Sequence, residues 1–216
     1  MAITASDVNT LRQSTGAGMM ECKRALEEAN GNQTLAAEIL MKKGIVKAAE
    51  RSGRLATEGA IGTYVHSGRI GAIVEINCET DFVTRTDEFK NLVRDIAMHV
   101  AASAPQFLDD SEIPPANLDK QREIFAALPE VQAKPENIRA KIVDGKIAKW
   151  KKEICLLDQP FVKDPDTTVR DHVVKTAAAT IKENVKIRRF MRFELGEGLE
   201  KKTTDFAAEV AAAAKV

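Results

Sequence analysis

The residue types that most often carry out chemistry are isolated in this sequence. The chain has three cysteines and three histidines, all far apart: Cys22, Cys78, Cys155, His66, His99 and His172. None has a neighbour at the spacing of a metal site. The odd number of scattered cysteines indicates reduced thiols in a cytosol-like compartment rather than a disulfide framework. We therefore expect no resident metal and no disulfide.

The motifs that bind phosphates or activate a nucleophile are also incomplete. Residues 16–18 and 196–198 hold only two of the three glycines of a dinucleotide fingerprint. Gly145-Lys146 is followed by Ile147, which cannot ligate magnesium as the Ser or Thr of a phosphate loop does. No Gly-x-Ser-x-Gly elbow is present. The sequence is therefore expected to need no cofactor and not to be an enzyme.

Two segments have residues suited to binding a protein partner, and the first is Thr15-Gly-Ala-Gly-Met-Met20. Methionine side chains are adaptable, and exposed ones favour docking. The alternative is that Met19 or Met20 is an ordinary core residue, which is the commoner location for methionine.

The second segment, Asn77-Cys-Glu-Thr-Asp-Phe-Val83, connects an apolar strand to a helix. A loop at a strand end can present Phe82 as a projecting wedge beside the carboxylate of Asp81. The alternative is that Phe82 folds back beneath the helix, because large apolar residues are usually internal. The residues alone leave both interpretations open.

The elements that must position these segments divide the chain into three parts. Residues 1–54 show apolar residues at helical spacing in three short stretches, which predicts a three-helix module. We expect Ser6 to cap the first helix, Asn32 or Thr34 to cap the third, and Gly44 to end the third helix. Residues 45–58, rich in Lys, Ala, Arg and Glu, are expected to form a helical or flexible connector.

Residues 55–200 alternate between strand and helix patterns, which predicts an α+β core. We expect antiparallel strands at 61–66 and 70–76 joined by a Ser67-Gly68 turn, with the second strand buried on both faces. Thr86 should cap an amphipathic helix that starts at Asp87. The remaining expectations are an inserted helical hairpin at 116–152, a strand at 153–158, a helix capped by Thr168, a strand at 185–195 and a terminal helical module at 201–216.

The composition narrows the classes of function. The 216 residues include 32 Lys+Arg and 32 Asp+Glu, so the net charge is zero. Nucleic-acid-binding proteins usually carry a basic excess, so direct nucleic-acid binding is not expected, although lysines on the hairpin and arginines near residue 190 are the exception to test. The sequence has no apolar run of 18 residues and no basic–apolar leader. We therefore expect no membrane span and no secretory signal.

Six segments, in the same order along the chain, resemble the bacterial-type translation elongation factor Ts family in its short form. They are Thr15-Gly-Ala-Gly-Met-Met-Glu-Cys-Lys-Arg-Ala-Leu26, Glu75-Ile-Asn-Cys-Glu-Thr-Asp-Phe-Val83, His99–Ser103, Gln159–Val162, Phe193–Gly198 and Thr204–Val210. The match covers essentially the whole chain. The resemblance implies that the N-terminal module is ubiquitin-associated-like.

The resemblance further implies a guanine-nucleotide exchange factor whose partner is the GTPase elongation factor Tu. It assigns Thr80, Asp81, Phe82 and Val83 to disturbing the partner's magnesium and phosphate site, and Arg12, Met19 and Met20 to gripping its nucleotide-binding domain. The second Thr-Asp-Phe, at 204–206, is instead interpreted as a helix cap with a packing residue.

The sequence departs from longer family members in having one core half instead of two. This leaves a homodimer, giving a 2:2 complex, or a monomer that binds with its single core half. The expected location is the cytoplasm, or the plastid stroma if the protein is organelle-encoded.

Overall fold

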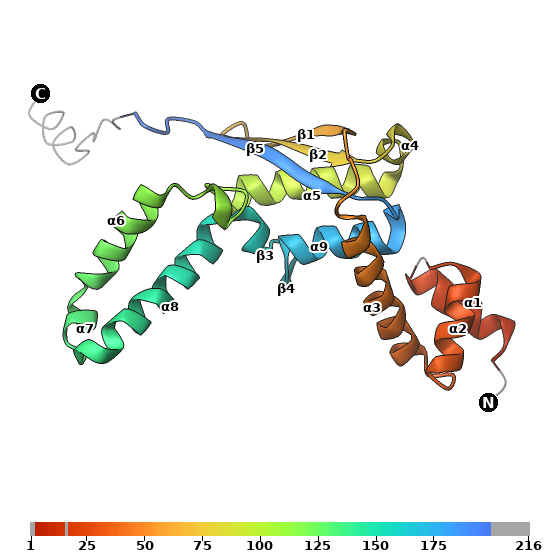
Figure 1. Cartoon of the computed structure of the whole chain (residues 1–216). Helices are drawn as coiled ribbons and strands as arrows, with labels where there is room; N and C mark the ends of the chain where they lie inside the picture. Colours follow the sequence, from red (N-terminus) through yellow and green to blue (C-terminus); the bar gives the residue numbers. More distant parts are fainter. Residues whose placement is uncertain (1–2, 16, 200–216) are drawn as a thin grey trace, which may run out of the picture.

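A computed structural model describes residues 3–15 and 17–199, arranged in an elongated molecule (Figure 1). Three N-terminal helices lie at one end and a helical hairpin lies at the other. A small antiparallel sheet on a long helix occupies the middle. The α+β class, the N-terminal three-helix module, the small sheet and the inserted hairpin are confirmed.

The N-terminal module consists of α1 (Ala5–Thr15), α2 (Met19–Glu28) and α3 (Gln33–Arg51). Its small core is centred on Leu11, Cys22 and Leu26, which are almost fully buried. The third helix is capped as expected, because Asn32 Oδ1 accepts a hydrogen bond from the backbone N–H of Leu35 (3.0 Å). The expected cap at Ser6 is wrong, because the capping residue is Thr4, two residues earlier, whose hydroxyl accepts from the Asp7 N–H (3.2 Å).

The prediction that Gly44 ends the third helix is also wrong. The helix continues through Gly44 to Arg51. A Cβ atom at Gly44 would lie 3.3 Å from the Ala178 Cβ of a later segment. The glycine therefore permits close packing between the module and the core instead of ending the helix.

The central sheet has the order β1-β2-β5 and is antiparallel throughout, with β1 (Glu58–His66), β2 (Ile70–Cys78) and β5 (Lys186–Glu194). The β1–β2 turn is the expected one. Ser67 and Gly68 both have positive φ angles (49° and 67°), as a tight hairpin of right-handed twist requires. In β2, Val74 and Ile76 point to the buried face.

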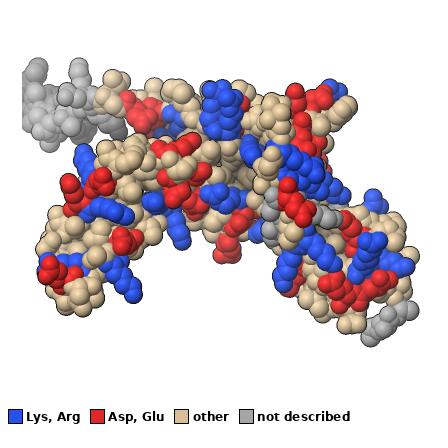
Figure 2. Space-filling model, viewed as in Figure 1, with Lys and Arg blue, Asp and Glu red and all other residues tan. Residues whose placement is uncertain are grey.

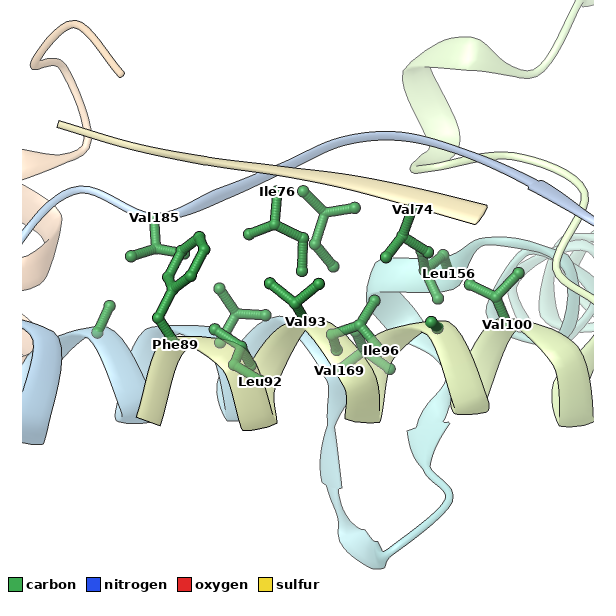
Figure 3. Packing of buried hydrophobic residues seen from close by; sticks show 14 of the residues in the cluster. Val74, Ile76, Phe89, Leu92, Val93, Ile96, Val100, Leu156, Val169 and Val185 are labelled. Atoms are coloured by element: carbon green, nitrogen blue, oxygen red, sulfur yellow. The ribbon is translucent and has the colours of Figure 1, made fainter. Parts of the chain in front are cut away.

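Helix α5 (Asp87–Ser103) covers the buried, inner face of the sheet. Figure 3 shows the side chains of the helix in contact with those of the sheet. Thr86 caps the helix as predicted by accepting from the Phe89 N–H (3.3 Å). Phe89, Ile96 and Val100 are fully buried against the sheet. The close approach is allowed by Gly62, where a Cβ atom would come within 2.2 Å of Val93 Cγ1.

The outer face of the sheet has no covering layer within the described chain, so the prediction that β2 is buried on both faces is wrong. Ile73 is 42% exposed, and its apolar neighbours on this face are exposed as well. We define the outer patch as Val65, Ile73, Met191, Phe193 and Leu195. The continuous apolar run of β2 therefore combines one core face with one open apolar face.

The hairpin follows α5 and consists of α6 (Pro115–Ala126), α7 (Pro129–Gln132) and α8 (Glu136–Ile154). A 3-10 turn, η1 (Asp110–Glu112), precedes it. The predicted strand at 153–158 is wrong. Helix α8 continues to Ile154, Cys155 forms a single bridge with Phe107, and η2 (Leu156–Asp158) is a 3-10 turn.

The elements between the hairpin and β5 support α5 from below the sheet (Figure 1). They are β3 (Pro160–Phe161), β4 (Asp164–Thr168), α9 (Val169–Thr176) and the π-helical turn η3 (Ala177–Ile181). Thr168 caps α9 as predicted, with its hydroxyl accepting from the Asp171 N–H (3.1 Å). The predicted helix at 201–216, with Thr204, Asp205 and Phe206, lies outside the described residues.

The buried His99 links α5 to the segment around β3. The Val162 N–H donates to His99 Nδ1 (3.2 Å), so Nε2 carries the proton and donates to Gln159 Oε1 (2.9 Å). Gln159 in turn donates to the Glu153 carbonyl (2.6 Å). Burial lowers the pKa of His99 from its ordinary value, so the neutral ring is the form that fits this network.

Gly62→Ala tests the approach of α5 to the sheet. The added Cβ would overlap Val93, and such overpacking typically costs about 1–3 kcal/mol of unfolding free energy. Urea denaturation measures the loss. Gly145→Ala, on the helical hairpin, is the control, because a Cβ there meets nothing within 4 Å. Equal stabilities of the two variants would contradict the proposed close packing.

The His99 network predicts a pH dependence of stability. Because the folded-state pKa is lowered, the unfolded chain binds the proton more readily below its own pKa of about 6.5. Stability should therefore fall with decreasing pH, by up to about 1.4 kcal/mol per unit for this residue. Denaturation of the protein and of His99→Gln between pH 8 and 5 should show a shallower slope for the variant. Identical slopes would exclude this role for His99.

Candidate functional site

The Thr80–Val83 segment follows β2 and comprises the N-cap residue and the first three residues of a single helical turn, α4 (Asp81–Thr84), rather than the expected open loop. Phe82 is 73% exposed, so the interpretation that it folds beneath the next helix is wrong. Val83 is only 8% exposed and belongs to the main core. Adjacent residues of α4 thus point in opposite directions, and the buried Val83 anchors the exposed Phe82.

The polar groups of α4 flank the aromatic ring. Arg85 Nη2 donates to Asp81 Oδ2 (2.8 Å), and the Arg85 guanidinium carbon lies 5.9 Å from the centre of the Phe82 ring. Both charged side chains are exposed, so the pair contributes little to stability and can exchange partners at low cost. The site therefore presents an apolar ring beside a carboxylate that is available for another polar partner.

Glu183 and Asn184 hold the base of α4, and the sequence analysis missed both residues. Glu183 Oε2 accepts from the backbone N–H groups of Glu79 (3.0 Å) and Thr80 (2.9 Å), and Oε1 accepts from the Thr80 hydroxyl (2.6 Å). The Asn184 N–H donates back to Glu79 Oε1 (2.7 Å). These partners lie over 100 positions apart in the chain, so no local pattern identifies them.

Cys78 closes the buried side of the same turn. Its thiol donates to the Thr80 carbonyl (3.2 Å), and it is fully buried. Burial raises the pKa of this thiol to about 11, so it stays protonated at neutral pH. Cys78 is therefore a packing and hydrogen-bonding residue here rather than a nucleophile.

The N-terminal candidates lie on a different element at the same end of the molecule (Figure 1). Met19 and Met20 occupy the first turn of α2 and are 54% and 61% exposed, so the core interpretation is wrong for both. Arg12 lies exposed in the last turn of α1. The fold thus leaves the side chains of Phe82 on α4 and of Met19 and Met20 on α2 exposed, whereas Val83, the other apolar candidate, is buried.

The lysines of the hairpin and the arginines of β5 are largely paired with carboxylates. On the hairpin, Lys146 Nζ lies 2.9 Å from Glu130 and Lys151 Nζ 3.3 Å from Asp110. On β5, Arg188 and Arg189 both bind Glu75, at 2.7 and 2.6 Å. Figure 2 shows positive and negative side chains interspersed over the visible face. This pairing weakens the argument for a phosphate-binding stripe.

Within residues 3–15 and 17–199, no group of three or more His, Cys, Asp or Glu side chains is placed to hold a metal ion. In the same part of the chain, no helix has the length and apolar character to cross a membrane.

The fold and the site define an α+β protein that presents exposed apolar side chains on a supported helical turn and on a small helical module. A family model described as "Elongation factor TS" matches residues 9–197. Proteins named elongation factor Ts from Carboxydothermus hydrogenoformans and Geobacter sulfurreducens are 56% and 54% identical over 215 residues, covering 99% of each chain. The chain belongs to the elongation factor Ts family.

Proposed function

We propose that this protein is the guanine-nucleotide exchange factor for elongation factor Tu in translation elongation. It binds the GDP form, displaces magnesium, promotes release of GDP and stays bound until GTP enters. The observation that carries the proposal is the exposure of the Phe82 ring on α4, next to Val83, which is buried in the core.

Each candidate residue has a distinct role in this proposal. Phe82 enters an apolar crevice of the GTPase, and Asp81 shifts polar groups that support its magnesium ion. Thr80 and Val83 set the shape of the turn. Arg12, Met19 and Met20 grip the nucleotide-binding domain from the N-terminal module.

Thermodynamic linkage explains how such docking accelerates exchange. A protein that binds the nucleotide-free GTPase more tightly than the GDP form must weaken GDP binding by the same factor. A thousandfold acceleration of release requires about 4 kcal/mol of differential stabilisation. Burial of a Phe side chain contributes about 1.5–3 kcal/mol, and a few polar contacts supply the rest. No covalent step is required.

We further propose that the chain works in three parts. Residues 1–54 provide the module that grips the partner. Residues 55–200 provide the core that presents α4, and residues 201–216 add contact area outside the described part of the chain. The carboxylate pairing of Arg188, Arg189 and Lys146 supports a protein rather than RNA as the partner.

Phe82→Ala tests the role of the aromatic ring. The variant should lower the stimulated release of labelled GDP from elongation factor Tu by about 10- to 100-fold, because it has no aromatic ring to bury when it binds the GTPase. Its thermal unfolding should be unchanged, since the side chain is exposed in the free protein. Val162→Ala, an exposed apolar truncation on the β3–β4 turn, is the matched control and should behave as the unmodified protein. An unchanged release rate in Phe82→Ala would refute the wedge.

We propose that a second copy of this chain covers the outer patch and so supplies the missing core half. The patch is one apolar sheet face, and two such faces pack well when stacked about 10 Å apart. Val65, Gly71 and Phe193 are paired across the three strands, with Ile73 and Met191 in the next row on the same face. The zero net charge of the chain imposes no general repulsion between copies.

Phe193→Asp tests this homodimer. A carboxylate in the stacked faces would be buried without a partner, so dissociation is expected. Sedimentation equilibrium should give twice the 23.6 kDa chain mass for the unmodified protein and the single mass for the variant. Ile124→Asp, an exposed apolar position on α6, is the control and should stay dimeric. A single mass for the unmodified protein would favour a monomer with one core half.

A further inference from the structure

We propose that Glu183 is a positioning residue that holds α4 in the conformation that presents Phe82. This inference rests on the proposed exchange function, which makes the position of Phe82 matter. Glu183 lies after the π-helical turn η3 and far from Phe82 in the sequence. Its influence passes through Thr80, the first residue of the Thr80–Val83 segment.

The contacts of Glu183 fix the two residues that precede α4, where the usual side-chain cap is absent. Thr80 is the N-cap residue of α4, yet its side chain makes no cap hydrogen bond to the helix. The hydroxyl instead donates to Glu183 Oε1 (2.6 Å), while the Glu79 and Thr80 N–H groups donate to Oε2. A carboxylate that accepts several hydrogen bonds makes stronger contacts than a neutral cap does.

Helix α4 needs such external support. A single turn of four residues is far too short to be stable by itself, because nucleation of a helix is unfavourable. Helix α4 is attached by the buried Val83 on its inner side, by the Cys78 thiol at the Thr80 carbonyl and by the Glu183 carboxylate at its start. Loss of the Glu183 contacts should increase the number of conformations open to Phe82, and binding would then cost more conformational entropy.

The chain turns sharply just before Glu183, and this turn places the Glu183 side chain beside Thr80. Lys182 adopts a left-handed conformation (φ 60°, ψ 21°), and its N–H donates to the Ala177 carbonyl (2.7 Å). Asn184 extends the same junction, because its amide donates to the Arg54 carbonyl (2.7 Å) at the end of the N-terminal helices. The start of α4, the turn after η3 and the connector from α3 thus meet at one point.

Two measurements on full-length Glu183→Ala and Glu183→Gln test the inference. Amide hydrogen exchange in the free protein should become about tenfold faster for residues 80–84 in Glu183→Ala, with Glu183→Gln intermediate because its amide oxygen still accepts. Stimulated release of labelled GDP from elongation factor Tu should fall about tenfold in Glu183→Ala. Asp166→Ala, which removes an exposed carboxylate on β4, is the matched control and should change neither measurement.

A third variant shows whether Glu183 acts through Phe82. In the Phe82→Ala background, Glu183→Ala should cause a much smaller loss of exchange activity than in the unmodified protein, because the aromatic ring that it positions is already absent and only Asp81 remains to be displaced. An equal additional loss in that background would overturn the proposal. Unchanged hydrogen exchange at residues 80–84 in Glu183→Ala would also overturn it. If Phe82→Ala alone left stimulated GDP release unaltered, the proposed wedge would fail; if the unmodified protein did not accelerate GDP release, the proposed function would fail. In either case hydrogen exchange would still decide whether Glu183 positions α4.

Discussion

The packing of α5 against the inner face of the sheet is the interaction on which the rest of the structure depends. Phe89 and Ile96 contribute from the helix and Ile76 from β2, and Gly62 lets the helix and sheet backbones come close. The same core includes Val83 of α4. The end of β2 and the start of α5 are therefore fixed together, and the short connection between them has little freedom. Phe82 lies on this connection, so the main core determines where the exposed ring points.

A supported ring has an energetic advantage over one on a free loop. Binding an ordered segment costs less conformational entropy than binding a flexible one, so more of the contact energy remains available to distort the partner. The structure achieves this order by burying Val83, by the thiol contact from Cys78 and by the Glu183 carboxylate. None of these three contacts occupies the exposed face of Phe82.

Local patterns in the sequence are sufficient to predict the long helices and strands. They are insufficient where contacts with residues far away in the sequence determine the conformation. The period of α5 and the Ser67-Gly68 turn were predictable because both depend on neighbours in sequence. Gly44 was misassigned because its role depends on Ala178, and the exposure of Phe82 could not be decided without the fold. Residues 153–158 resembled a strand, but helix α8 and a contact to Phe107 determine their conformation. Glu183 gave no local signal at all.

The layout of β2 allows both proposed interfaces to be occupied at once. The outer patch centres on the first half of the strand, where Gly71 is opposite Phe193 and Ile73 is opposite Met191. The cluster of Glu75 with Arg188 and Arg189 follows, and α4 begins beyond Cys78. Ile73 and Cys78 are five positions apart, which is about 17 Å along a strand. A second copy stacked on the outer patch would therefore leave Phe82 free, and each chain of a dimer could engage its own GTPase.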